Sequence, residues 1–146
     1  MKYIIPILLL CFTANTFAAD ISVDMLNKRK SDNAPMVYSE DISRIDVGDT
    51  ITWLPTTKGH NVHIKVGPEG WEIQKKSKLN KEYSHTFTMP GVYYYECTPH
   101  KTMGMIALVV VGGDTSNLDT IADIKIGGKS KKKLAKLVEE LQNETN

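Results

Sequence analysis

A short segment near residue 100 brings three metal-binding side chains close together in the sequence. Cys97 lies three residues before His100 and eight before Met105, and a further imidazole stands upstream at His60. Two imidazoles, one thiolate and a weak axial thioether are the ligand set of a blue-copper electron-transfer site. Structural zinc is held by a closed tetrahedral set, usually with paired cysteines, and no such pair occurs here. We therefore predict that His60, Cys97, His100 and Met105 bind one type 1 copper ion.

The spacing of these residues matches a turn between two strands. Residues 91–97 are rich in β-branched and aromatic side chains, and residues 105–111 are almost entirely apolar. Between them, 98–102 reads as a turn in which Pro99 restricts its own φ and removes a backbone donor. Taken alone, Cys97 would be interpreted as a small buried hydrophobe. The complete set of four favours a metal site.

The first 18 residues have the pattern of a secretory signal peptide. Lys2 gives a positive start, residues 4–12 form an apolar run, and small residues end the segment at Ala18. The apolar run is too short to span a bilayer. We expect export to the periplasm with cleavage after Ala18, which leaves 128 residues for one domain with a real core.

Cysteine count and charge narrow the function further. Cys11 lies in the predicted signal peptide, so Cys97 is the single thiol of the exported chain and has no partner for an internal disulfide. Copper ligation would occupy that thiol.

Loss of Lys2 leaves 17 basic against 17 acidic residues, which argues against general affinity for nucleic acid or anionic membranes. We expect a monomer without nucleic-acid partners or stable membrane association.

Alternation of apolar and polar residues predicts about eight short strands. The expected ranges are 20–26, 36–38, 43–47, 50–54, 61–66, 83–88, 91–97 and 105–111. Trp53, Tyr83, Phe87 and residues 109–111 are expected to fill the core between two sheets. Residues 67–81 lack this period and read as a loop with room for a helical turn. The pattern predicts an all-β fold, an eight-stranded Greek-key β-sandwich.

The C-terminal residues change to a helical period. We expect one helix over 117–124 and a second capped by Ser130, two short α-helices packed on the sandwich. Lys131, Lys132 and Lys133 crowd the positive end of the second helix dipole. They form either a solvated face or an extension of a docking surface. The expected organisation is a signal peptide over 1–18, a copper-binding sandwich over 19–111 and a helical extension over 112–146.

These motifs resemble the pseudoazurins, small periplasmic blue-copper proteins of the cupredoxin family. The resemblance extends to residues 25–28, 48–50, 90–93 and 103–106, and to the helical end of the chain. It implies that His60 is a buried ligand, that His100 is the electron port and that Met105 tunes the reduction potential. It also implies that the backbone of Asn61 donates to the Cys97 sulfur while its side chain joins the two ligand loops.

The resemblance further implies a docking surface around His100. An apolar patch is expected from Ala34, Pro35, Met36, Pro99 and Met103, and a surrounding ring from Lys28, Lys30, Lys58, Lys76, Lys78 and Lys101. The chain departs from the usual pattern at Glu96, where a lysine is common, and at Lys101, which replaces a common aromatic. The implied partner is a copper-containing nitrite reductase, with nitrous-oxide or cytochrome partners as alternatives.

Two histidines remain outside the predicted site. His63 and His85 are expected on exposed sheet faces. We interpret the chain as a one-electron carrier and not an enzyme, because it has no nucleophile–base pair or open metal site that we recognise. The alternatives are a copper-binding carrier or buffer that delivers metal, and a metal-free binding sandwich.

Overall fold

A computed structural model of the protein describes residues 18–144. Apart from Ala18, the predicted signal peptide lies outside the described residues, so its cleavage stays a prediction. Within the described part of the chain, no helix combines the length and apolarity that crossing a membrane requires.

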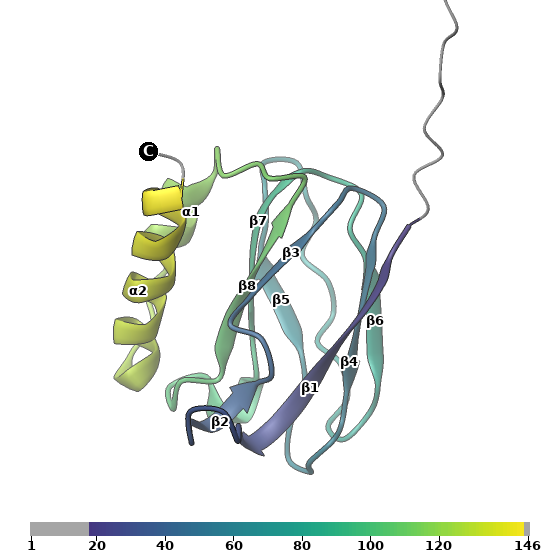
Figure 1. Cartoon of the computed structure of the whole chain (residues 1–146), viewed down its shortest axis with the longest axis vertical. Coiled ribbons are helices and arrows are strands. Elements are labelled where there is room, and N and C mark those ends of the chain that lie inside the picture. Colours follow the sequence, from purple (N-terminus) through teal and green to yellow (C-terminus); the bar gives the residue numbers. More distant parts are fainter. Residues whose placement is uncertain (1–17, 145–146) are drawn as a thin grey trace, which may run out of the picture.

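Eight strands form two four-stranded sheets that pack face to face (Figure 1). They are β1 (Asp20–Lys28), β2 (Pro35–Tyr38), β3 (Ile42–Ile45), β4 (Thr50–Leu54), β5 (His63–Val66), β6 (Tyr83–Thr86), β7 (Gly91–Glu96) and β8 (Ile106–Val111). One sheet has the order β2-β1-β4-β6 and the other β3-β8-β7-β5. The pairs β1–β4 and β3–β8 are parallel, and the remaining neighbours are antiparallel. The predicted all-β sandwich is confirmed.

One strand begins later than expected. The strand predicted over 61–66 starts at His63, because Val62 is paired with a loop instead of the sheet. The Val62 N–H donates to Ser77 Oγ at 2.9 Å, and the Val62 carbonyl accepts from the Ser77 N–H at 2.8 Å. The loop over 67–82 contains no helix. It folds back onto the residues that follow His60.

The main core lies between the two sheets and is rich in aromatic side chains. Trp53, Phe87 and Tyr95 are fully buried there, whereas Tyr83 is only partly buried. Val109 and Val111 face this core, but Val110 faces the opposite side, so its predicted place between the sheets was wrong. Successive side chains of a strand alternate between faces. All residues of β7 and β8 are buried because helices cover their second face, which explains their nearly continuous apolar sequence.

Two helices cover the outer face of the β3-β8-β7-β5 sheet (Figure 1). They are α1 (Leu118–Ala122) and α2 (Gly128–Glu144). The predicted apolar stripe of α2 is buried against the sheet and consists of Leu134, Leu137, Val138 and Leu141. Ser130 is not the cap: α2 begins two residues earlier, and the Ser130 hydroxyl accepts a hydrogen bond from the Gly104 N–H.

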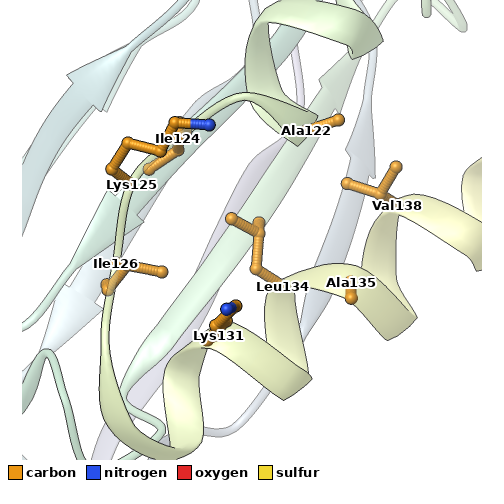
Figure 2. A pocket seen from close by; sticks show the side chains of 8 residues that line it. All are labelled: Ala122, Ile124, Lys125, Ile126, Lys131, Leu134, Ala135 and Val138. Carbon is orange, nitrogen blue, oxygen red and sulfur yellow. The ribbon is translucent and has the colours of Figure 1, made fainter.

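The helices and their connection leave a mostly apolar hollow. Figure 2 shows the side chains that line it: Ala122, Ile124, Lys125, Ile126, Lys131, Leu134, Ala135 and Val138. None of the predicted copper ligands is among them. Lys125 and Lys131 are therefore lysines of the helical extension that line a hollow without any predicted ligand.

Ion pairs hold α2 to the sandwich at two places. Arg44 of β3 pairs with Glu140 at 3.4 Å and also with Glu144. Near the other end of α2, Lys133 lies 2.6 Å from Asp41. Asp41 in turn receives two hydrogen bonds of 3.0 Å from Arg29.

The environment of Asp41 predicts a pH-dependent stability. Burial alone would raise the pKa of Asp41, but Arg29 and Lys133 outweigh it and hold that pKa below its ordinary value. The resulting stabilisation is complete above the unfolded-state pKa of about 3.9 and is lost as pH falls through the lower folded-state pKa. We expect Asp41→Asn to lower the free energy of unfolding of copper-free protein by about 1–2 kcal/mol at pH 7.

Urea unfolding at pH 7 and pH 3 measures this effect. The difference between Asp41→Asn and wild type should be smaller at pH 3. Asp46→Asn, at an exposed aspartate, is the control. A difference as large at pH 3 as at pH 7 would show that the Asp41 charge is not the cause.

Candidate metal centre

The predicted ligand loop closes the end of the β7–β8 pair. Cys97 directly follows β7, and a single 3₁₀ turn, η1 (Thr98–His100), follows Cys97. The Cys97 N–H donates to the Met105 carbonyl at 3.0 Å, and the His100 N–H donates to the Cys97 carbonyl at 3.0 Å. The antiparallel ladder is thereby extended one pair beyond the two strands. The predicted strand–turn–strand arrangement is confirmed.

His60 reaches the same place from the loop after β4. Its Nδ1 lies 3.2 Å from His100 Nδ1 and 3.8 Å from Cys97 Sγ, and His100 Nδ1 lies 3.5 Å from the same sulfur. An ion of zinc's size in a planar trigonal set would need N···N and N···S separations of about 3.5–3.8 Å, given metal bonds of about 2.0 and 2.3 Å. The triangle of two nitrogens and one sulfur therefore fits a first-row metal ion. All three donors lie within 4.8 Å of one another.

Met105 lies beside this triangle in the core. It is fully buried, in the same cluster as Cys97, and the hydrogen bond from the Cys97 N–H fixes its backbone next to that residue. The residue predicted as the weak axial ligand, which distinguishes copper sites from zinc sites, is therefore held beside Cys97 in the core.

The ring of His60 is oriented by a residue that the sequence analysis did not assign. His60 Nε2 lies 2.8 Å from Asn27 Oδ1, so it carries the proton and donates to that oxygen. This leaves Nδ1 unprotonated and facing the other two donors, as metal ligation requires. Burial, together with the neighbouring His100, lowers the pKa of His60 and keeps the ring neutral. No local sequence signal connects Asn27 with His60, 33 residues away.

Asn61 joins the two ligand loops, as the sequence analysis expected. Its Oδ1 accepts from the Thr98 N–H at 2.8 Å, and its Nδ2 donates to Thr98 Oγ1 at 3.2 Å. Its carbonyl accepts from the Tyr38 hydroxyl at 2.8 Å. One buried amide thus fixes the separation between the residue after His60 and the residue after Cys97.

A third segment supports His60 from the loop over 67–82. The Asn80 N–H donates to the His60 carbonyl at 2.9 Å, and Asn80 Oδ1 accepts from the Gly59 N–H at 2.6 Å. This contact was not predicted, because nothing in the sequence pairs Asn80 with a residue about 20 positions earlier.

The environment of Cys97 disfavours a free thiolate. Burial raises the pKa of Cys97, although the backbone N–H groups of Asn61 and His100 act in the opposite direction. The Asn61 contact agrees with the expected backbone donor. A bound cation deprotonates a coordinating thiol, so metal binding at this place would release a proton.

The surface around the site differs from the expected pattern at Glu96. Glu96 stands where the resemblance makes a lysine common, and it is only 3% exposed. It accepts a hydrogen bond from the Tyr94 hydroxyl at 2.9 Å and pairs with Lys65 at 3.5 Å. The Glu96 side chain is therefore buried and does not form part of the exposed surface around the site. The six expected ring lysines, by contrast, are all exposed: Lys28, Lys30, Lys58, Lys76, Lys78 and Lys101.

The predicted apolar patch is partly assembled. Met103 is 46% exposed, and it lines one hollow together with Ala34 and Pro35. Pro99 is also exposed, whereas Met36 is half-buried and packs against the core. The same hollow is lined by four lysines of α2: Lys129, Lys132, Lys133 and Lys136.

The three lysines at the start of α2 have different roles. Lys131 is exposed to solvent, and Lys132 is exposed beside Met103. Lys133 fits neither expected alternative, because it is mostly buried and bonded to Asp41 and to the Gly104 carbonyl.

The two remaining histidines lie away from the donor triangle. His63 is half-buried and opposes Glu96 across β5 and β7. Both histidines were expected to be exposed, and that was wrong for each. His85 is also half-buried, with its ring against Phe87 and the ring centroids 4.7 Å apart. Burial lowers the pKa of both histidines.

Comparison with known proteins agrees with this geometry. Residues 23–112 match the copper-binding proteins of the plastocyanin/azurin family. The chain is 42% identical to the pseudoazurin of Paracoccus pantotrophus, over 86% of each chain. It is 41% identical to the solved structure of a Sinorhizobium pseudoazurin, with a TM-score of 0.78, covering 84% of this chain and 96% of that one. For the Methylobacterium extorquens AM1 pseudoazurin the identity is 36% and the TM-score 0.77, over 85% and 100%.

The chain therefore belongs to the plastocyanin/azurin family of copper-binding proteins, and within it to the pseudoazurins. Its cofactor is one type 1 copper ion, and its function is that of a blue-copper electron carrier. The donor triangle fits this cofactor, because two imidazoles and one thiolate form the trigonal plane of blue-copper sites.

The contact between Asn27 and His60 predicts a weaker site when it is lost. In Asn27→Ala, His60 Nε2 loses its acceptor, so the ring is free to turn and to change tautomer. Loss of such a partner typically costs ten- to a hundredfold in metal affinity, and we expect roughly that loss for copper. Competition with a chelator of known affinity measures it, with Lys28→Ala at the adjacent exposed residue as the control. Equal affinities in Asn27→Ala and wild type would show that Asn27 does not orient the ligand.

Proposed function

We propose that the protein is a periplasmic one-electron carrier whose copper is held by His60, Cys97, His100 and Met105. The observation that carries the proposal is the donor triangle, with edges of 3.2, 3.5 and 3.8 Å, next to a buried methionine. When bound, copper supplies the one-electron couple. The chain keeps the donors in one arrangement and excludes water from them.

Each proposed ligand has a separate role. Cys97 binds as the thiolate, His60 is the fully buried imidazole, and Met105 is the axial thioether. His100 is only half-buried, so its ring is the shortest route from the site to the surface. We infer that electrons enter and leave there, beside the exposed side chain of Met103.

The proposed partner is a respiratory enzyme with an acidic docking surface. Six exposed lysines, proposed to surround the ligand loops, and the exposed apolar side chains of Met103 and Pro99 favour such a partner. By resemblance to the pseudoazurins, a copper-containing nitrite reductase is proposed, with a cytochrome as the alternative. The proposal includes a signal peptide over 1–18, a copper-binding sandwich over 19–111 and a helical extension over 112–146.

The optical spectrum tests the proposal directly. Wild-type protein loaded with copper should have an intense visible band that bleaches reversibly with a mild reductant. A colourless copper-loaded protein would contradict electron transfer and favour the alternative of metal buffering or delivery.

Variants of the ligands test the individual assignments. Cys97→Ala should remove the visible band while leaving a folded sandwich, because the sulfur supplies the charge transfer and the strands supply the core. Met105→Gln should keep copper but lower the reduction potential, because a harder axial oxygen favours Cu(II). A persistent band in Cys97→Ala, or an unchanged or higher potential in Met105→Gln, would mean that the assigned ligand is wrong.

The lysines around His100 predict salt-dependent association. Electrostatic attraction is screened over about 8 Å at physiological ionic strength, so association with an acidic partner should slow steeply as salt is added. Replacing both Lys58 and Lys101 with Ala should slow association roughly two- to tenfold at low salt, with the spectrum and potential unchanged. Met103→Ala should weaken the complex with little change in salt dependence.

Stopped-flow reduction kinetics with a copper nitrite reductase measure these rates. Lys125→Ala and Lys131→Ala together are the matched control, because both lysines border the hollow of Figure 2, which includes none of the proposed ligands. Lys133 is unsuitable as a control because it bonds to the ligand loop. A larger effect from the control pair than from Lys58 and Lys101 would move the docking surface away from His100.

A further inference from the structure

The first turn of α2 lies directly against the ligand loop. The Lys129 N–H donates to the Thr102 carbonyl at 2.9 Å. Gly128 has a φ of +65°, and a Cβ added there would overlap the Thr102 carbonyl oxygen. The helix therefore begins with glycine at the point where its backbone meets the loop. Gly127, one residue earlier, has open space around it.

Both peptide groups of Gly104 are held by side chains of α2. The Gly104 N–H donates to Ser130 Oγ at 3.0 Å, and Ser130 is completely buried. The Gly104 carbonyl accepts from Lys133 Nζ at 3.1 Å and from the Ile106 N–H at 2.9 Å. Gly104 has a φ of +109°, a backbone conformation that glycine adopts far more readily than other residues.

Lys133 connects this contact to two other parts of the chain. Its Nζ lies 2.6 Å from Asp41, which receives two hydrogen bonds from Arg29. Arg29 also donates to the carbonyls of Tyr38 and Ser39. Lys133 is therefore fixed in place by a network that includes Arg29 just after β1, the end of β2 and the residues before β3.

The loop holds the Met105 carbonyl through the Cys97 N–H at 3.0 Å, but it restrains the amide side of Met105 less. The Met103 N–H donates to the His100 carbonyl at 2.9 Å, but the bond from the Met105 N–H to that carbonyl is longer, at 3.4 Å. Gly104 immediately precedes Met105, so the groups that hold Gly104 also determine where Met105 lies relative to Cys97 and His100. The axial ligand is the one that tunes the potential of a blue-copper site.

We propose that the start of α2 is a positioning element of the copper site. Gly128, Ser130 and Lys133 hold the loop over 102–104 and thereby set the position of Met105 and the reduction potential. This inference rests on the proposed ligand role of Met105. The helix lies beyond residues 23–112, which match the plastocyanin/azurin family, so it adds a restraint to the part of the chain that the family shares.

Hydrogen exchange in copper-free protein tests the mechanical part of the inference. Ser130→Ala removes the acceptor of the Gly104 N–H, and Gly128→Ala pushes the helix away from Thr102. Exchange of the Gly104 amide should become roughly two- to tenfold faster in each variant, as the loss of one hydrogen bond predicts. Gly127→Ala is the matched control and should exchange as wild type does. Unchanged exchange in both variants would overturn the inference.

The potential of the copper-loaded variants tests the functional part. We expect the midpoint potentials of Ser130→Ala and Gly128→Ala to differ from wild type, and that of Gly127→Ala to equal it. Faster exchange with unchanged potential and visible spectrum would overturn the positioning role and leave α2 as packing only. Failure of the proposed function gives a different result, because wild-type protein would then lack the copper colour whatever the exchange rates.

Discussion

The site depends on one spatial constraint: donors from two loops must meet with edges of 3.2 to 3.8 Å although His60 and Cys97 lie 37 residues apart. A single amide satisfies much of this constraint, because Asn61 bonds to both the backbone and the side chain of Thr98. The arrangement has a cost, since burial disfavours the Cys97 thiolate. A bound cation offsets that cost, because it stabilises the thiolate. The same burial also excludes water from the site once copper is bound.

The remaining structure keeps this triangle in place. β7 ends just before Cys97 and β8 begins just after Met105, and both strands are buried on both faces, by the second sheet on one side and by α1 and α2 on the other. Close-packed interiors resist small displacements. Cu(I) and Cu(II) prefer different geometries, so a scaffold that imposes one compromise reduces the rearrangement that accompanies each electron. The helices are part of this scaffold and not an appendage.

Much of the site could be predicted from the sequence, because the chemistry of the side chains and their spacing along the chain are visible there. Residue type and spacing led to the four proposed donors, three of which the structure brings together, and alternation predicted the eight strands. The sequence did not reveal three contacts: Asn27 with the His60 ring, Asn80 with the backbone beside His60, and Lys133 with the ligand loop. Each of them joins residues 20 to 33 positions apart. The same limit explains the errors at Val110 and Ser130 and the unpredicted burial of Glu96. Their burial depends on which element covers the second face of the sheet or on a partner brought close by folding.

The central claim is that the protein holds the three equatorial donors in nearly one arrangement, whatever the charge of the ion between them. Crystal structures of the copper-free, oxidised and reduced protein, determined from the same crystal form, test it most directly. The account predicts that copper binds between His60 Nδ1, Cys97 Sγ and His100 Nδ1, and that each edge of the triangle changes by less than about 0.5 Å among the three states. Copper bound elsewhere, or a triangle that opens when the ion is reduced or removed, would contradict it.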